Sequence, residues 1–318
     1  MPDRLEVAKT YKLFIDGKFP RSESGRTFAV SDAAGRIHAH MCRASRKDLR
    51  DATSAARKAL PGWRDATAYL RAQIMYRMAE MMEGKRDEFA AALRVGSGYL
   101  NAPRGIENKK PHAERGGTHE VTAAIDRLVA FAGWADKYAQ VLGCNNQVAG
   151  PYYNFTVPEP TGVVGVLAPD EPGLLGLISL LAPVMCAGNT AVVVGGSGPG
   201  ASLATAILAE VIATSDVPAG VVNLLTGDRA ELLPVMAGHR DIDAIHAAGV
   251  TPEQRQTLRE GAAENVKRVT VRDTGPIGSK KSKGHTVPVD FFDAAACQSP
   301  WWIEPFVEMK TIWHPSAA

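Results

Sequence analysis

The stretch that decides the fold is Thr161–Thr226, TGVVGVLAPDEPGLLGLISLLAPVMCAGNTAVVVGGSGPGASLATAILAEVIATSDVPAGVVNLLT. Short valine-rich runs alternate here with longer apolar stretches, and this pattern predicts strand, helix, strand, helix, strand. The alternation continues as a helix over Ala230–Ala237, a strand over Ile242–Ile245, a helix over Pro252–Glu264 and a strand over Val269–Val271. Strands that alternate with helices predict an α/β fold with a doubly wound parallel sheet.

The chain on either side of this stretch has its own local signals. Leu70, Ile74, Met78, Met81 and Met82 recur at helical spacing, which favours core packing over an adaptable binding face. The other expected elements are strands over Tyr11–Ile15, Thr27–Val30, Tyr152–Pro158 and Phe306–Trp313, a helix from an N-cap at Ser45 to a stop at Pro61–Gly62, helices over Asp65–Val95 and Val121–Leu142, a loop over Gly96–Gly117 and a charged linker over Ser279–His285.

The composition excludes several classes of protein. The 36 basic and 34 acidic residues leave a net charge of +2, which gives no reason to expect binding to nucleic acid or to an anionic membrane. The longest apolar-rich run, Gly173–Ala187, is too short and too broken to span a bilayer. The four cysteines form no CxxC pair and no signal peptide is evident, so we expect a cytoplasmic chain with buried free thiols. No histidines or carboxylates have metal-ligand spacing, so we expect no metal.

Several motifs together resemble the aldehyde dehydrogenase superfamily. They are GVVGVLAP, LLAPVMCAGNTAVVV and PAGVVNLLTG in the central stretch, FIDGKF near the N-terminus, FAGWADK at Phe131–Lys137 and the terminal FVEMKTIWHP. The resemblance covers most of residues 11–272, with a separate match at 306–315. It implies a fold of the aldehyde dehydrogenase NAD-binding-domain type, with N-terminal helices and a bridging β-arm. The implied divisions are residues 1–150 for the N-terminal part of that domain, 151–160 for a bridging strand, 161–275 for the Rossmann-like core and 276–318 for a linker and a second bridging strand.

The chemistry that the resemblance implies needs a cysteine nucleophile, an asparagine that stabilises the oxyanion and a glutamate base. Glu171 stands where the asparagine belongs, and a carboxylate is an acceptor that would repel a forming alkoxide. Arg272 stands in place of the base, and Asp273, one residue further along, points to the other face of a strand. Cys297 is the nearest thiol and lacks the family's flanking residues, so a packed side chain beside Trp301 is the favoured interpretation. We therefore predict no catalytic residue.

The positions that would bind the cofactor are also altered. The resemblance assigns them to Pro169, Val194, Ser197, Gly227 and Gly249. Val194 replaces the lysine that holds the ribose, and Ser197 replaces an acidic residue. Gly249 is the surviving glycine of a turn before a helix, which leaves a possible anion site of low affinity. We expect either no cofactor or only weak binding of NAD(P).

These observations lead to one prediction for the function and two alternatives. The prediction is a non-catalytic aldehyde dehydrogenase family member, similar to the truncated second module of the two-module family 16 enzymes. It would be a scaffold or regulatory subunit that binds a full-length aldehyde dehydrogenase through Tyr152–Pro158 and Phe306–Trp313. The alternatives are an NAD(P)-dependent oxidoreductase that acts on an aldehyde through Cys297, and a nucleotide-binding module without turnover.

Overall fold

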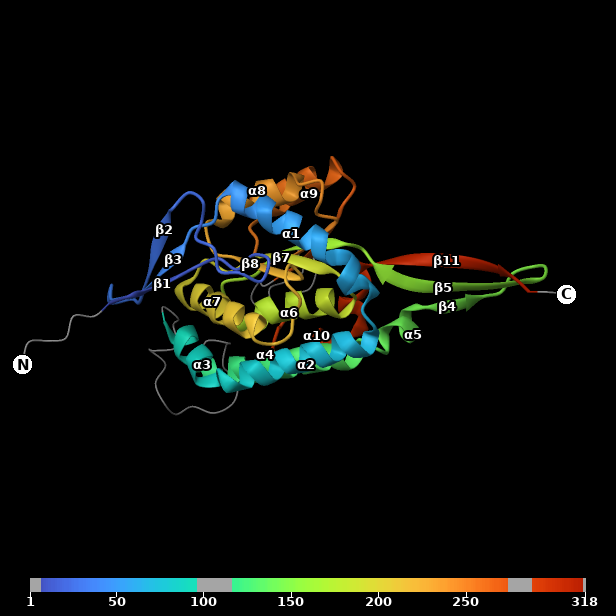
Figure 1. The fold of residues 1–318 in the computed structure, drawn as a ribbon, viewed down its shortest axis with the longest axis horizontal. Coiled ribbons are helices and arrows are strands. Elements are labelled where there is room, and N and C mark those ends of the chain that lie inside the picture. The colour runs from blue at the N-terminus through green and yellow to red at the C-terminus, as the bar shows by residue number, and fades with distance from the viewer. Residues whose placement is uncertain (1–6, 96–115, 274–287, 317–318) are drawn as a thin grey trace, which may run out of the picture.

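A computed structural model describes residues 7–95, 116–273 and 288–316 of the chain. Their centre is a five-stranded parallel sheet with helices on both faces, and a narrow three-stranded arm extends from one end (Figure 1). The central sheet has the order β10-β9-β6-β7-β8 and contains β6 (Val163–Leu167), β7 (Thr190–Val194), β8 (Val222–Leu225), β9 (Ala244–Ala248) and β10 (Arg268–Arg272). The predicted α/β fold with a doubly wound parallel sheet is confirmed.

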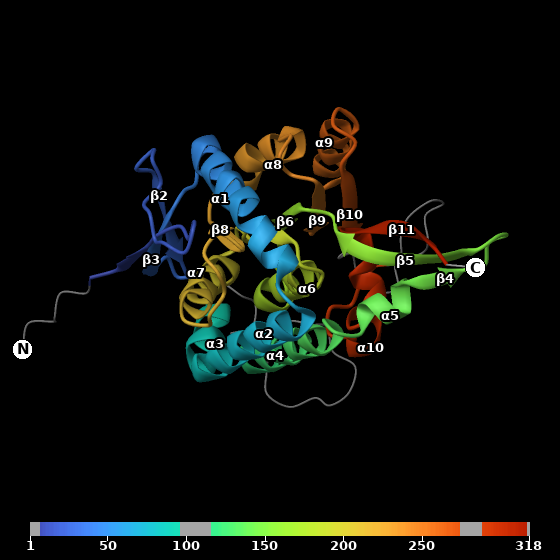
Figure 2. The ribbon, with the colours of Figure 1, turned by 45° about the vertical axis from the view of Figure 1, so that its right-hand side comes forward.

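Each face of the central sheet has its own apolar core. One face packs against α6 (Gly173–Cys186) and α7 (Pro199–Ala213), and the other against α1 (Arg46–Asp65), α8 (Arg229–Gly238) and α9 (Pro252–Ala263) (Figure 2). Along β6, Val164 and Val166 belong to the first core, whereas Val163 and Leu167 belong to the second. Burial on both faces explains why the strands read as unbroken apolar runs.

A second layer of helices covers α6 and α7. It consists of α2 (Ala68–Gly84), α3 (Arg86–Arg94) and α4 (Gly116–Trp134), followed by the short α5 (Tyr138–Leu142). Ile74, Met78 and Met82 are buried in the core, which confirms the packing role of this stripe, and Met81 packs against the core from a partly buried position. The expectation was wrong for Leu70, whose side chain is exposed at the start of α2.

The boundaries of the first helices differ from the prediction. The helix α1 continues through Pro61 and Gly62 to Asp65, because Trp63 is buried and its indole N–H donates to the carbonyl oxygen of Met185 at 3.2 Å. The single helix expected over Asp65–Val95 is two helices, since Thr67 caps the start of α2 and Lys85 separates α2 from α3. The helix expected over Val121–Leu142 is likewise divided into α4 and α5.

A small sheet near the N-terminus has the order β1-β3-β2 and contains β1 (Lys9–Tyr11), β2 (Thr27–Ser31) and β3 (Ile37–Cys42). The strand expected over Tyr11–Ile15 is mostly wrong, since β1 ends at Tyr11, whereas Phe14 forms an isolated bridge with Leu224 of the central sheet. The strand β3 has no counterpart in the prediction, although Ile37, Ala39 and Met41 alternate there with His38 and His40.

The arm consists of β4 (Cys144–Asn146), β5 (Tyr152–Pro160) and β11 (Val307–Pro315), in the order β11-β5-β4. The strands β5 and β11 pair antiparallel over their full length, from Val307 opposite Pro160 to Pro315 opposite Tyr152. The predicted pairing of these two strands into a β-arm is therefore confirmed, and its bridging to another chain stays a prediction. The strand β11 lies at its edge, and Figure 1 shows the arm extending away from the central sheet.

The sequence predicts a loop before α4 and a linker before the last strand of the arm. Gly116 and Gly117 begin α4, and the rest of the loop expected over Gly96–Gly117 and the linker Ser279–His285 lie outside the described residues. The segment after residue 287 contains α10 (Ala294–Cys297) and the 3₁₀ turns η3 (Pro300–Trp302) and η4 (Glu304–Phe306). Within the described ranges, no helix combines the length and apolar character needed to cross a bilayer.

Candidate functional site

The topology of the central sheet defines where a ligand would be expected. The chain passes from β6 to β7 and β8 on one side, then returns to form β9 and β10 on the other side of β6. In open α/β sheets the crevice for a ligand lies beyond the carboxyl ends of the strands at this reversal. Here that position is between the end of β6 at Leu167 and the end of β9 at Ala248.

An arginine side chain spans this position. Arg229 is the first residue of α8, and its Nη1 donates to the carbonyl oxygen of Gly249, directly after β9, at 2.8 Å. Its Nη2 donates to the carbonyl oxygen of Ala168, directly after β6. The residue is only 7% exposed, and burial lowers the pKa of its guanidinium, whereas the nearby Asp170 acts to raise it. Arg229 thus bridges the two strands at the point of reversal.

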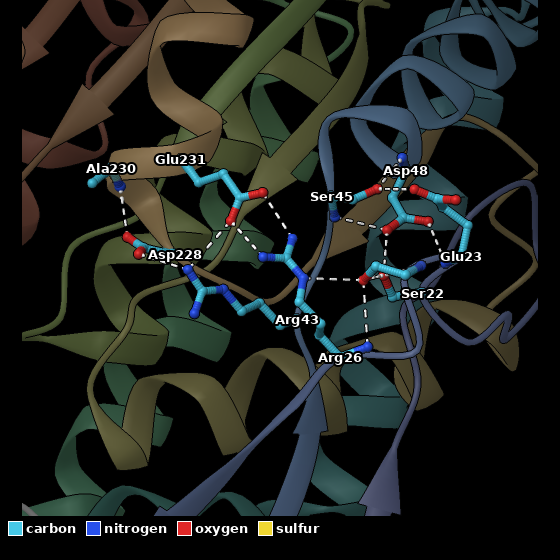
Figure 3. A network of polar contacts seen from close by, with 10 residues as sticks. Ser22, Glu23, Arg26, Arg43, Ser45, Asp48, Asp228, Ala230 and Glu231 are labelled. Carbon is cyan, nitrogen blue, oxygen red and sulfur yellow. Dashed lines mark hydrogen bonds and ion pairs between the residues drawn. The ribbon is translucent and has the colours of Figure 1, made fainter.

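A network of charged groups holds the start of α8 and thereby orients Arg229 (Figure 3). Arg26 binds Glu231 through both of its terminal nitrogens, at 2.8 and 3.2 Å. Arg43 donates to Asp228 at 3.1 Å and to Glu231 at 3.3 Å. Asp228 in turn accepts from the backbone N–H of Ala230 at 2.8 Å and caps the helix. The residues on either side of Arg229 therefore face outward to this network, while Arg229 faces inward.

The other half of the network secures the loop that carries Arg26. Asp48 accepts from the Ser22 hydroxyl at 2.7 Å and from the backbone N–H of Ser45 at 2.8 Å. Ser45 and Asp48 form a capping box at the start of α1, which confirms the predicted N-cap. The loop over residues 20–26 is thus tied to α1, which helps to fix the position of Arg26 (Figure 3).

Two helix N-termini near the crevice are closed by carboxylates of the chain itself. Asp170 Oδ1 accepts from the backbone N–H groups of Ser197, at 2.5 Å, and Gly198, at 3.1 Å, immediately before α7. Glu120 Oε1, on α4, accepts from the N–H groups of Leu174 and Leu175 at 2.8 and 3.1 Å, at the start of α6. Helix N-termini favour negative charge, and these carboxylates supply it internally.

The predicted cofactor positions differ in burial and in their contacts. Val194 is 0% exposed and packs in the second core cluster, with Leu167 and Leu225. Gly249 has a φ of +61°, a left-handed conformation that suits glycine, and its carbonyl oxygen binds Arg229. Of the others, Pro169 and Gly227 are buried, and Ser197 is exposed with its N–H bound to Asp170. Glu171, which stands in the position expected for the oxyanion asparagine, is exposed.

Glu171 also lines a small cavity next to these positions. The cavity has a volume of about 110 Å³ and lies between Leu93 and Val95 on one side and the starts of α6 and α7 on the other. Glu120 and Asp170 line it together with Glu171. The carboxylates in this lining disfavour an anionic ligand there.

The residues expected near the nucleophile are packed into the core. Cys297 is 0% exposed, its thiol lies 3.3 Å from the carbonyl oxygen of Asp290, and burial raises the pKa of that thiol. The expected neighbour Trp301 is largely exposed, which corrects the prediction, and the tryptophan buried in this region is Trp302. Asp273, the carboxylate one residue after the position expected for the base, pairs with Arg255.

Arg272, in the position expected for the base, contacts a buried histidine and a tryptophan ring. Its Nε donates to Nε2 of the buried His246 at 3.2 Å, and its guanidinium lies 4.0 Å from the centre of the Trp302 ring. Burial and the charge of Arg272 lower the pKa of His246 well below its ordinary value. Among the described residues, no group of histidine, cysteine and carboxylate side chains could hold a metal ion.

Comparison with known proteins adds the family. Residues 19–275 match the family model described as "Aldehyde dehydrogenase family", more than half of the chain. The chain belongs to this family. It is 31% identical over 273 residues to mouse (Mus musculus) retinal dehydrogenase 2, and 30% identical over 276 residues to an aldehyde dehydrogenase of Aspergillus niger. These alignments cover 84% and 85% of this chain but only 49% and 51% of the relatives, so the family member spans about half their length.

A solved aldehyde dehydrogenase has the same fold as this family member. The NAD⁺ complex of the Bacillus cereus enzyme superposes with a TM-score of 0.71 at 27% identity, covering 84% of this chain and 51% of the other. The side chains that characterise the crevice of this chain, Arg229, Asp170 and Glu120, carried no recognised signal in the sequence. A lone arginine at a helix start usually reads as a surface residue, and only the fold shows that it points inward.

Proposed function

We propose that this chain is a non-catalytic member of the aldehyde dehydrogenase family that serves as a scaffold or regulatory subunit of a full-length aldehyde dehydrogenase. The observation that carries the proposal is the arm. The strand β11 is nine residues long, lies at the edge of its sheet and is largely exposed. An exposed edge strand offers backbone groups to which another chain can add a strand.

The side chains of the arm favour contact with another protein. Trp313 and Met309 lie on one face of β11, and they are 58% and 46% exposed. Tyr152 of β5 lies on the same face and meets Trp313 edge to face, with their ring centres 5.8 Å apart. Aromatic and methionine side chains are enriched at protein interfaces. The surface of the partner that we propose is therefore apolar, and β11 adds to it as a strand.

The root of the arm is firmly held, as a docking element requires. Asn189 is buried directly before β7 and accepts from the N–H of Gly162, next to β5, at 2.8 Å. The same side chain donates to the carbonyl oxygen of Phe306, next to β11, at 2.9 Å. Arg268 on β10 donates to the carbonyl oxygen of Val307 at 2.6 Å and pairs with Glu308. Both long strands are thus anchored to the central sheet.

The non-catalytic part of the proposal rests on the interior of the chain. Only residues 273–306 lie between β10 and β11. The family resemblance implies a catalytic domain of well over a hundred residues at that point. The arrangement is similar to the truncated second module of the family 16 enzymes. The buried thiol of Cys297 and the exposed carboxylate of Glu171 in the expected asparagine position also disfavour aldehyde oxidation.

The residues at the crevice do not fit a dinucleotide. Arg229 spans the ends of β6 and β9, and Asp170 holds the two N–H groups before α7. Val194 offers a buried isopropyl group where the family resemblance implies a lysine. No reaction step is therefore assigned to NAD(P) in this chain.

Co-purification tests the proposal. The chain is expressed with an intact aldehyde dehydrogenase from the same genome, and the mixture is analysed by size-exclusion chromatography. We expect coelution, which the substitution Trp313→Lys abolishes and the matched substitution Ile37→Lys, at an exposed strand position outside the arm, leaves intact. A chain that stays alone with every such enzyme contradicts the scaffold function. Formation of NADH from short aldehydes by the isolated chain would instead support the oxidoreductase alternative, and calorimetric binding of NAD⁺ without turnover the nucleotide-binding alternative.

A further inference from the structure

A cavity lies between β1 and α7, at the end of the molecule opposite the arm (Figure 1). Its volume is about 260 Å³, which exceeds the roughly 150 Å³ of a protein cavity that accommodates benzene. It is smaller than the roughly 300 to 1,000 Å³ of sites for drug-sized molecules. The cavity therefore has room for a compact ligand with one or two rings.

Two aromatic side chains, Tyr11 and Phe19, line the cavity together with Ala206 of α7. The ammonium group of Lys9 lies 4.2 Å from the centre of the Tyr11 ring and covers one of its faces. Phe19 is 38% exposed, although its ring centre lies only 5.1 Å from that of the buried Phe14. The uncovered parts of the two rings and the methyl group of Ala206 form apolar walls that suit an aromatic ring.

The turn that precedes Phe19 holds this wall in place. Ile15 and Lys18 exchange two backbone hydrogen bonds of 3.0 Å across the turn Asp16–Gly17. Both turn residues have a left-handed backbone, with φ of 53° and 70°, as in the tight turns that join antiparallel segments. The first N–H of the turn also donates to the side chain of Asn223, in the central sheet, at 3.0 Å. The position of Phe19 is thus fixed before a ligand binds, which lowers the cost of binding.

The charged side chains at the cavity leave one positive charge uncompensated. Lys9 pairs with Glu210 at 3.0 Å, and Glu210 also pairs with Lys85 at 2.7 Å. Lys85 has a second partner in Glu88, at 2.8 Å. Lys12 also lines the cavity, is exposed, and has no ion-pair partner within the described part of the chain. The cavity thus combines apolar walls with an ammonium group that is available to a ligand.

We propose that this cavity is a binding site for a small aromatic carboxylate. The ring packs against Tyr11 and Phe19, and the carboxylate pairs with Lys12. Sites of this kind combine mostly apolar walls with a few polar groups that fix the orientation of the ligand. The site does not depend on the arm and goes beyond the proposed scaffold function. Because oxidation of an aldehyde yields a carboxylate, the ligand class also suits a subunit of an aldehyde dehydrogenase, and this link alone rests on the proposed function.

Three probes test the class of ligand. Benzoate, benzamide and acetate are titrated separately into the isolated, isotope-labelled chain at constant ionic strength, and the backbone amide signals are followed by NMR. We expect benzoate to shift the signals of residues 9–12, 19 and 206–210. Benzamide keeps the ring but lacks the charge, and should bind about threefold more weakly. Acetate keeps the charge but lacks the ring, and should bind about tenfold more weakly.

Three results of these titrations overturn the proposal. They are a benzoate titration without shifts, benzoate shifts confined to other parts of the chain, and binding of benzamide or acetate as tight as that of benzoate. Because no partner enzyme is present, these outcomes leave the proposed scaffold function untouched, and loss of coelution with an aldehyde dehydrogenase leaves the site untouched.

Charge reversal identifies the cation. Lys12→Glu should weaken the binding of benzoate about tenfold, because an attraction becomes a repulsion. Lys58→Glu makes the same change at an exposed position of α1 outside the cavity, and should leave the affinity as in the wild type. Circular dichroism checks that both variants are folded, and if Lys12→Glu is not, the three probes in the wild type still decide the proposal. Equal affinities of two folded variants would contradict the proposal as stated.

Discussion

Arg229 donates a hydrogen bond of 2.8 Å to the carbonyl oxygen of Gly249, and this contact joins the start of α8 to the end of β9. With its second bond, to Ala168, the same guanidinium also reaches the end of β6. A side chain thus connects the strands at the point where a doubly wound sheet usually receives its ligand. The network around Arg26, Arg43 and Asp228 fixes the helix start that makes this possible.

Replacing Arg229 should destabilise the folded chain. Arg229→Met leaves the carbonyl oxygens of Ala168 and Gly249 without this donor, and unpaired buried acceptors are costly. We expect the free energy of unfolding, measured with urea, to fall by about 2 to 4 kcal/mol. The control Arg240→Met, at an exposed position, should change it by less than about 0.5 kcal/mol. Equal effects of the two substitutions would refute the bridging role.

The thiols should differ sharply in reactivity. Cys144 is exposed on β4, in contrast to the expectation of four buried thiols, whereas Cys42, Cys186 and Cys297 are buried. Burial raises the pKa of both Cys186 and Cys297, which keeps them protonated near neutral pH. Labelling with a maleimide at pH 7 should therefore modify Cys144 quickly and the others only after unfolding. Rapid labelling of Cys297 in the folded chain would contradict its assignment as a packed side chain.

His246 should make the fold sensitive to acid. Its Nδ1 contacts the carbonyl oxygen of Leu180 at 3.0 Å and its Nε2 accepts from Arg272, so the neutral ring carries its proton on Nδ1. The folded-state pKa lies well below the ordinary value of 6.5, so the unfolded chain binds a proton first as the pH falls. Stability from this group is complete above pH 6.5 and is lost below it. In an NMR titration, the His246 ring signal should not shift between pH 8 and pH 6; a midpoint near 6.5 would show this environment to be wrong.

Asn189 should anchor the root of the arm. Asn189→Leu keeps the size of the side chain but removes its bonds to Gly162 and Phe306. We expect lower stability and faster hydrogen exchange at the root of the arm, in residues 160–162 and 306–308, because these backbone groups lose their buried partner. The strand pairs further out, such as Trp313 opposite Asn154, should exchange as in the wild type. Unchanged exchange at the root would mean that Asn189 does not anchor the arm.

The central sheet was predictable because its strands are buried on both faces and therefore carry uninterrupted apolar runs, as in Val163–Leu167. The arm was predictable because Tyr152–Pro158 and Phe306–Trp313 have strand composition and a family resemblance. The strand β3 was missed although Ile37, Ala39 and Met41 alternate with His38 and His40, which is the pattern of a half-buried strand. The crevice side chains were missed because nothing local distinguishes Arg229 or Asp170 from surface residues. Their positions follow from the sheet order, which brings together segments distant in sequence.

Hydrogen exchange on the arm tests the account most directly. In the isolated chain, the outward-facing backbone N–H groups of β11 should exchange quickly, because β11 is an edge strand. Addition of a full-length aldehyde dehydrogenase that coelutes with the chain should slow exchange over residues 307–315, and should leave the edge strand β1 unchanged. A stable complex that protects a different surface and leaves residues 307–315 as they are in the isolated chain would contradict the proposed function.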